Sequence, residues 1–548
     1  MNYQDLANLL YPDVKYDIKD LEEKYPKRNL NEGAEVCRFA PSPTGRMHMG
    51  NLFASFIPEV FAKQSNGVFI LRIEDTDEKR AIENGVQLIL DDLENFNYIV
   101  DEHPIKGGEY GPYVQTERAE IYHTVAKYLV SIGRAYPCFC SSEDLTEMRN
   151  MQELNKERIG YYGSFAKCRN LSFEEVKKRI ENGDKWVLRL KSMGDFNKKF
   201  IFNDLVKGSI ELPENDIDQV LIKSDGIPPY AFAHVCDDHF MRVTMVTRDD
   251  SYISSVPYHL EIWNACGFEA PKFAHLLPLN KKEGETIRKI SKRKDPEAAV
   301  AFYHEKGIPN EAIKLYFATL MNSNFEEWFL QNQDKTYRDF KFTCDKMSTS
   351  GSLFDLEKLM NISKVYFSKL SASEIYDRLL NYTKQYDEEF YSLIKDKRDY
   401  MVNLLNIERE VERPRMDIGS YSDVKKEFWY MFDELFDKVD APYKEVNYSY
   451  DVSFIKEYFS DVYNEEDTEE DWFNKVKEFA SNKGFAVNRK EFKENPDKFL
   501  GNIADFCSII RVMLTTSNMS PNMYDLLKIY GKEKLLNRVE LFLNNINK

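Results

Sequence analysis

The chain has 548 residues, which is too long for a single hydrophobic core and suggests roughly three to five domains. Hydrophobic residues make up 43% of the sequence and charged residues 30%, values that exclude a disordered or fibrous protein. The formal net charge of −17 argues against a protein that binds polyanions over its whole surface, although it leaves room for a local basic track that contacts nucleic acid.

The sequence contains no segment that predicts a membrane span or a secretory signal. No apolar run approaches the ~18 residues that a membrane-spanning helix needs. The N-terminal stretch is acidic and is interrupted by Pro12. The eight cysteines are sparse in so long a chain, and without a signal they are expected to be reduced. We therefore expect a cytoplasmic, multidomain enzyme with no membrane association.

The N-terminal half begins with strands that alternate with helices. Residues 35–40 are typical of a short buried strand, which the prolines and glycine of PSPTG end, and residues 68–75 are typical of a second strand. Apolar residues at helical spacing predict helices over 51–63, where Pro58 should introduce a kink, and over 85–96. This alternation predicts a parallel sheet, whose ligands bind beyond the carboxyl ends of the strands.

The sequence pattern changes after about residue 107. We interpret residues 107–225 as a domain inserted between two halves of the sheet, with helices at 119–132 and 171–182 and a strand at 186–191. Apolar, β-rich segments return at 219–226 and 239–250. Beyond about residue 331 the pattern is almost wholly helical, for example at 355–369, 373–386 and 522–545.

The segment RFAPSPTGRMHMGN, residues 38–51, is the strongest local signal. It predicts a strand that ends in a turn and a helix that begins near His48, whose backbone N–H groups form an anion site suited to phosphate. His48 can donate a hydrogen bond to a phosphate oxygen there, and Gly50 allows close backbone approach. Taken alone, a turn with an incidental surface histidine is an equally good interpretation.

The segment RKISKRKD, residues 288–295, is the second signal. A mobile loop of this kind can clamp a triphosphate and stabilise the charge of a departing pyrophosphate. The alternative is a solvated charged loop, which is the usual explanation of an isolated basic cluster. The cations that surround its serine are Lys289, Lys292, Arg293 and Lys294.

Together with further motifs, these segments resemble the class I glutamyl-tRNA synthetases of bacterial type. The matching segments follow the family's order and are RFAPSPTGRMHMGN (38–51), LRIEDTD (71–77), GPYVQTER (111–118), SDGIPPYAFAHVCDDH (224–239), KISKRK (289–294) and MSTSGSLFDLEKLMN (347–361). A tract at 511–542 resembles the C-terminal end of the family's anticodon region. The resemblance covers about residues 36–542, and so many motifs in order make coincidence implausible.

The resemblance implies an α/β catalytic domain of Rossmann type, interrupted by an inserted domain and followed by an all-α anticodon-binding region. The implied parts are an N-terminal extension of unknown role (1–34), the first half of the catalytic domain (35–106), the inserted domain that binds the tRNA acceptor end (107–225), the second half with the signature loop and stem contacts (226–330), and the helical anticodon-binding region (331–548).

The implied activity is the ATP-dependent attachment of L-glutamate to the 3′ end of tRNA(Glu) through glutamyl-adenylate. ATP is a substrate, Mg²⁺ is required, and the enzyme is expected to be a monomer. For catalysis the family's pattern indicates His48, Lys289 and Lys292; for ATP binding it indicates His48, Gly50, Asn51 and Lys292. For glutamate it indicates Arg38, Ser42, Glu74, Tyr230 and Arg248. Arg248 can pair with the side-chain carboxylate and Glu74 with the ammonium group.

The sequence departs from the family's pattern at two places near the site. Asn51 stands where related class I enzymes often carry histidine. Asp249, Asp250 and Ser251 follow Arg248 where relatives often read Gly-Glu-Asp, which puts the local hydrogen bonding of Arg248 in doubt.

A group of cysteines resembles the zinc knuckle of some relatives. Its members are Cys138, Cys140 and Cys168. Asn170 stands at the position of the fourth ligand, where asparagine is a poor donor to zinc, and Tyr161 or Tyr162 are the available substitutes. An empty, reduced site is slightly favoured over a zinc site, and no metal ligand is assigned.

Three alternatives remain beside a glutamate-specific ligase. A non-discriminating enzyme would also charge tRNA(Gln) with glutamate. A shorter relative that modifies a tRNA base lacks the region after residue 330, so the length of this chain argues against it. A binding protein that has lost catalysis is expected to have lost the phosphate-contacting residues, yet His48, Lys289 and Lys292 are intact.

Overall fold

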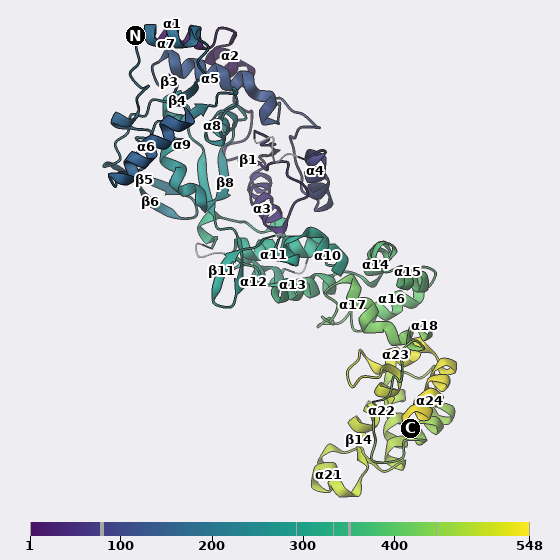
Figure 1. Cartoon of the computed structure of the whole chain (residues 1–548). Helices are drawn as coiled ribbons and strands as arrows, with labels where there is room; N and C mark the ends of the chain where they lie inside the picture. The colour runs from purple at the N-terminus through teal and green to yellow at the C-terminus, as the bar shows by residue number, and fades with distance from the viewer. Residues whose placement is uncertain are drawn as a thin grey trace. The chain divides into compact units, whose positions relative to one another are not determined.

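The computed structural model describes residues 2–76, 82–291, 293–332, 334–348, 352–444 and 446–546. The chain forms two compact units (Figure 1). The first consists of Met1–Phe302 and Lys314–Asp355, and the second consists of Tyr303–Ile313 and Leu356–Lys548.

The first unit is built on a parallel sheet of four strands. Their order across the sheet is β2 (Val68–Leu71), β1 (Val36–Phe39), β8 (Met245–Asp249) and β9 (Lys272–Leu276). Strands from distant parts of the sequence are therefore neighbours in the middle of the sheet, where Cys37 of β1 pairs with Met245 of β8. The predicted α/β fold with a parallel sheet is confirmed.

Helices cover both faces of this sheet, as its apolar strands require. The helix α3 (Met49–Gln64) leads from β1 to β2 and packs on one face, and α9 (Val256–Cys266) leads from β8 to β9. On the other face, Val36, Ile70 and Val246 belong to the core that α9 completes with α5 (Ala119–Ser131) and α8 (Tyr230–Phe240). Because β1 and β8 are neighbours whose connections run to opposite edges, a crevice is expected at their carboxyl ends.

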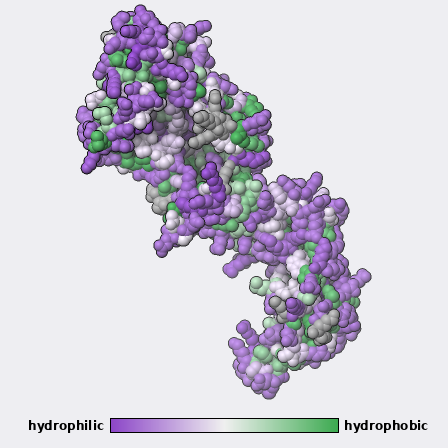
Figure 2. Space-filling view, viewed as in Figure 1, coloured by the Kyte–Doolittle hydropathy of each residue, from purple (hydrophilic) through white to green (hydrophobic). Residues whose placement is uncertain are grey.

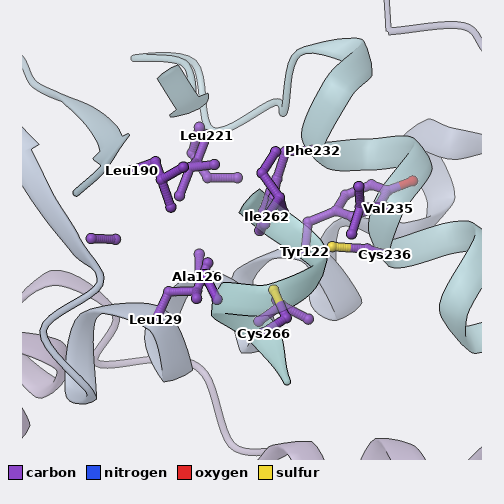
Figure 3. Packing of buried hydrophobic residues seen from close by; sticks show 14 of the residues in the cluster. Tyr122, Ala126, Leu129, Leu190, Leu221, Phe232, Val235, Cys236, Ile262 and Cys266 are labelled. Carbon is purple, nitrogen blue, oxygen red and sulfur yellow. The ribbon is translucent and has the colours of Figure 1, made fainter. Parts of the chain in front are cut away.

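The segment of residues 107–225 shares its core with α8, α9 and the parallel sheet. Its antiparallel sheet contains β3 (Ala135–Cys138), β4 (Val187–Leu190) and β7 (Val220–Ile222). Figure 3 shows side chains of α5, β4, β7, α8 and α9 gathered in one apolar cluster. The segment also contains α6 (Ser142–Leu154), α7 (Phe173–Glu181) and a hairpin of β5 (Lys199–Asp204) and β6 (Gly208–Pro213).

The N-terminal extension is helical and belongs to the core of the first unit. The helices α1 (Tyr3–Leu10) and α2 (Ile18–Lys24) pack against α5 and bury Leu6, Leu10 and Leu21. Polar contacts fix the segment that follows, because Arg28 pairs with Glu102 at 2.6 Å.

A small sheet contains the first residues of the basic segment 288–295. The strand β10 (Leu279–Glu283) pairs antiparallel with β11 (Thr286–Lys289) and parallel with β12 (Ser352–Leu353). The remaining α-helices before residue 332 are α4 (Gly85–Asn95), α10 (Val300–Lys306), α11 (Asn310–Met321) and α12 (Phe325–Gln331).

The second unit is helical, as predicted for the C-terminal region, with one small parallel pair of strands. The predicted helix over 522–545 is two helices, because Gly531 adopts a φ of 88° that ends the first. The elements are α13 (Leu356–Lys369), α14 (Ala372–Tyr386), α15 (Glu388–Ile394), α16 (Arg398–Asn406), α17 (Tyr421–Phe428), α18 (Asp433–Phe436), α19 (Phe454–Glu457), α20 (Glu469–Asn482), β13 (Phe485–Ala486), α21 (Arg489–Glu494), β14 (Gly501–Asn502), α22 (Ile503–Thr515), α23 (Met523–Tyr530) and α24 (Lys532–Ile546).

Hydrophilic side chains cover most of the visible face of each unit in Figure 2. Among the described residues, no helix combines the length and the apolar character that crossing a membrane requires.

Candidate active site

A cavity of about 450 Å³ opens at the carboxyl ends of β1 and β8, where the topology predicts a ligand site. One wall comes from the turn after β1 and the start of α3, with Pro41, His48, Gly50 and Asn51. The other walls come from β8, from the segments after β8 and β9, and from Lys289 at the end of β11. Residues of both segments singled out in the sequence, 38–51 and 288–295, therefore line one cavity.

His48 is the N-cap of α3, and its side chain is held by the helix it caps. Its Nδ1 accepts a hydrogen bond of 3.1 Å from the backbone N–H of Asn51. Because Nδ1 is the acceptor, the proton of the neutral ring is on Nε2, which makes Nε2 a donor. A Cβ atom on residue 50 would lie 2.9 Å from Cε1 of His48, so only glycine leaves room for this ring position.

Lys289 lies over the cavity and is held by an acidic neighbour. Its Nζ is 2.9 Å from Oδ2 of Asp249, and its side chain is 61% exposed, so the lysine can exchange this partner for an anionic ligand. The turn that follows is fixed by Asp295, which accepts two hydrogen bonds from the guanidinium of Arg288 at 2.7 and 2.8 Å. Lys292, predicted to contact ATP, lies outside the described residues.

A buried network of arginines and aspartates joins α8 to β1 and to the segment after β2. Asp238 on α8 accepts from Arg38 of β1 at 3.1 Å and from Arg72 after β2 at 2.6 Å. The neighbouring Asp237 pairs with Arg118 at 2.6 Å. These five side chains are at most 4% exposed. Buried charges are tolerated only when they are paired, so the network fixes α8 against the two strands.

Glu74 and Tyr230 lie beside this network. Arg72 pairs with Glu74 at 3.1 Å. Burial raises the pKa of Glu74 to about 7, although Arg72 and Arg38 oppose the shift. Burial, and next the charge of Glu74, raises the pKa of Tyr230 to about 12. Glu74 is therefore poised to lose a proton near neutral pH when a cation binds.

Arg248 occupies the end of β8 without a carboxylate partner. It is 8% exposed, and its Nε and Nη1 bond to ring nitrogens of His275 and His259 at 2.9 and 3.0 Å. Its Nη2 is buried and makes no hydrogen bond. Within 4.0 Å of Arg248, the described residues offer no carboxylate oxygen. The arginine thus presents an unsatisfied donor and an unneutralised charge next to the cavity that it lines.

The structure brings Arg38, Glu74, Tyr230 and Arg248 into one cluster, since the charges of the other three all act on Tyr230. Ser42, the fifth residue predicted to bind glutamate, is exposed in the turn after β1, where its carbonyl accepts from Thr44. The sequence prediction missed the supporting residues Asp237, Asp238, Arg118, His259 and His275. A signal did exist for the aspartates, because two consecutive acids follow Val235 and Cys236 within an otherwise apolar helix.

The three predicted cysteines of the inserted segment lie together. Their Sγ atoms are all within 4.8 Å of one another. The hydroxyl of Tyr161 joins them, at 3.4 Å from Cys138 and 3.3 Å from Cys140. Of the two tyrosines considered from the sequence, only Tyr161 does so, because the Tyr162 hydroxyl donates to the carbonyl of Arg158.

Comparisons with known proteins agree on one family. Residues 35–361 match the class I tRNA synthetases (E and Q), catalytic domain. Glutamate–tRNA ligases of Acetivibrio thermocellus and Clostridium perfringens are 43% and 42% identical to this chain, and each alignment covers 99% of this chain and 100% of the relative. A crystal structure of a glutamate tRNA ligase from Elizabethkingia meningosepticum in complex with its amino acid has a TM-score of 0.75 and 25% identity, covering 93% of this chain and 99% of that one.

The buried network generates a prediction about stability. Asp238→Ala removes the carboxylate that two buried arginines share, so that Arg38 loses this partner and Arg72 keeps only Glu74 at 3.1 Å and Asp237 at 3.7 Å. Breaking a buried pair in this way should lower the free energy of unfolding by about 3–5 kcal/mol. The matched control is Glu211→Ala, which breaks an exposed pair with Lys199 and should cost less than about 1 kcal/mol. Chemical denaturation followed by circular dichroism measures both. Equal losses would contradict the role given to Asp238.

Proposed function

Because the chain belongs to the class I tRNA synthetases for glutamate and glutamine, and within them to the glutamate–tRNA ligases, we propose that it charges tRNA(Glu) with L-glutamate through glutamyl-adenylate. The observation that carries the proposal is the buried, unsatisfied Nη2 of Arg248 beside the cavity. A carboxylate matches a guanidinium in both charge and geometry, and glutamate brings that carboxylate on its side chain.

Glutamate carries an ammonium group besides its two carboxylates, so its site must also offer a negatively charged group. Glu74 is the group that receives the ammonium, and Arg248 receives the side-chain carboxylate.

The phosphate side of the cavity is formed by His48 and Lys289. An oxygen of the glutamate α-carboxylate attacks the α-phosphorus of ATP, and the bond to the bridging oxygen of pyrophosphate breaks. The Nε2–H group of His48 and the start of α3 favour negative charge on the α-phosphate. Lys289 leaves Asp249 and contacts the departing pyrophosphate. ATP would be bound as its Mg²⁺ complex, in which the metal ion would neutralise part of the phosphate charge.

The second half-reaction transfers the glutamyl group to tRNA. A hydroxyl of the terminal ribose attacks the carbonyl carbon of the adenylate, and AMP leaves. The inserted segment contacts the acceptor end, and the helical second unit contacts the anticodon arm. The identity with glutamate–tRNA ligases extends over both parts, which supports this division of roles.

The central test is a charging assay with the purified chain, glutamate, ATP and either tRNA(Glu) or tRNA(Gln). We expect glutamyl-tRNA(Glu), with pyrophosphate released, and a rate lowered by roughly 10²–10³ in Lys289→Ala. Substitutions in the tRNA(Glu) anticodon should raise the KM for tRNA more than they lower kcat. Glutamylation of tRNA(Gln) as well would identify the non-discriminating alternative, and no charging of either tRNA would refute the proposal.

Glu74 predicts a pH dependence of glutamate binding. Its pKa is raised to about 7, so the protonated form, which cannot hold an ammonium group, predominates below that pH. The KM for glutamate should therefore fall as pH rises through about 7 and level off above it. Glu74→Gln should raise this KM by about tenfold or more and remove the step. The KM for ATP is the internal control, and an unchanged step in the variant would exclude Glu74 as its source.

We infer that the cysteine cluster binds a structural zinc ion, because its three thiols and the Tyr161 hydroxyl provide four donors in one place. The ion would fix the segments that carry these residues and would supply no chemistry to the reaction. We expect one zinc per chain by mass spectrometry of metals, none in Cys140→Ser, and weaker retention against a chelator in Tyr161→Phe. Full folding with no bound metal after purification in zinc would contradict this assignment.

A further inference from the structure

The guanidinium of Arg248 is held almost entirely by uncharged groups. Its Cζ lies over the rings of Phe273 and Tyr252, at 4.9 and 5.4 Å from their centroids. Its edge is held by the two histidine nitrogens described above, at 2.9 Å from Nε and 3.0 Å from Nη1. Such an enclosure orients the group without reducing its charge.

His275 can accept from Arg248 only because Asp204 fixes its tautomer. The Nδ1 of His275 is 2.7 Å from Oδ2 of Asp204, so this nitrogen carries the proton and Nε2 keeps its lone pair. Burial lowers the pKa of His275, which keeps the ring neutral.

Asp204 is itself fixed by main-chain groups. It ends β5 and accepts from the backbone N–H groups of Val206 at 2.9 Å, Lys207 at 2.8 Å and His275 at 3.0 Å. The next residue, Leu205, donates to the carbonyl of Phe273 on β9. The hairpin of β5 and β6 thus places the Asp204 carboxylate where it bonds to His275 and not to Arg248.

The other three buried arginines of the site, unlike Arg248, are neutralised by carboxylates. Arg38, Arg72 and Arg118 each contact a carboxylate at 2.6–3.1 Å. An aspartate at the position of His275 would neutralise Arg248 in the same way and remove its reason to select an acidic side chain. Interposing a neutral imidazole keeps the orientation and preserves the charge.

We propose that His275 and Asp204 are positioning residues for substrate selectivity, which hold Arg248 through a neutral acceptor so that Nη2 remains available to the side-chain carboxylate of glutamate. This inference rests on the proposed function, because it takes Arg248 to be the residue that binds that carboxylate. It predicts that His275, which contacts neither amino acid, contributes to the discrimination of glutamate from glutamine.

A matched pair of variants at position 275 separates positioning from structural support. His275→Gln places an amide oxygen near the position of Nε2, which keeps the bond to Arg248 and loses the bond to Asp204. His275→Asn places an amide N–H near the position of Nδ1, which keeps the bond to Asp204 and loses the bond to Arg248. The two variants differ in which of the two bonds they remove and are otherwise of similar polarity.

The measurement is ATP–pyrophosphate exchange with glutamate or glutamine, in the presence of tRNA. In His275→Asn we expect the KM for glutamate to rise about tenfold or more, with the KM for ATP and the thermal midpoint altered much less, because a hydrogen bond to a charged group is lost. The preference for glutamate over glutamine should fall with it. His275→Gln should lose less of this preference than His275→Asn, and the reverse order would overturn the proposal.

Two further variants keep the outcomes distinguishable. Arg248→Gln tests the proposed site. If it lowers the activation of glutamate and glutamine equally, the assignment of Arg248 is wrong. If Arg248→Gln selectively lowers glutamate activation but the two His275 variants do not differ, only the positioning role is refuted. Asp204→Leu provides a second route if a variant at 275 unfolds. It should also reduce selectivity, and equal increases in the KM values for ATP and glutamate would contradict the proposal.

Discussion

The sharing of Asp238 between Arg38 and Arg72 is the interaction on which the architecture of the site depends. Arg38 lies in β1 and Arg72 directly follows the neighbouring parallel strand β2, whereas the aspartate comes from a helix about 165 to 200 residues later in the chain. Taking these charges out of water is costly, so the arrangement persists only while all partners are in place. The requirement ties β1, β2 and α8 into one body and thereby fixes the turns that line the cavity.

The same part of the molecule uses arginine in two opposite ways. Three guanidinium groups are neutralised by aspartates and act as structural members, whereas the fourth, Arg248, is surrounded by rings and keeps its charge. A buried cation without a counter-ion lowers stability, which is the cost expected of a site whose ligand supplies the missing carboxylate. In the proposed function, glutamate binding would satisfy the Nη2 donor that folding leaves unpaired.

Much of this fold could be predicted from local patterns, and the failures have physical reasons. The strands β1 and β2 and the helix α3 follow from apolar runs and spacing, and His48 indeed begins its helix. Residues 239 and 240 read as β-rich but end α8, because periodicity does not separate a buried helix from a buried strand. The sequence offers Tyr161 and Tyr162 equally as partners of the cysteines, and only the position of the Tyr161 hydroxyl distinguishes them.

The pairing of the supporting residues could not be predicted from the sequence, for a different reason. Arg38 and Arg248 could be named from the family's motifs, but the partners that give them different electrostatic states are not their neighbours in sequence. Asp204 and His275 are 71 residues apart, and nothing in either local segment indicates the other. Pairings of this kind depend on the crossing of the inserted hairpin with β9, which only the three-dimensional arrangement specifies.

The central position of β1 in the sheet has a consequence for synthesis of the protein. Its partner β8 begins at Met245, so β1 and β2 leave the ribosome long before the strand that completes their hydrogen bonding. At about 5–20 residues per second, the delay is roughly 10–40 s. During that interval one edge of β1 is open to wrong partners, and the intervening insertion is translated first. We expect the nascent chain to need protection in this window, which would make the order of translation, as much as the final contacts, a determinant of its yield.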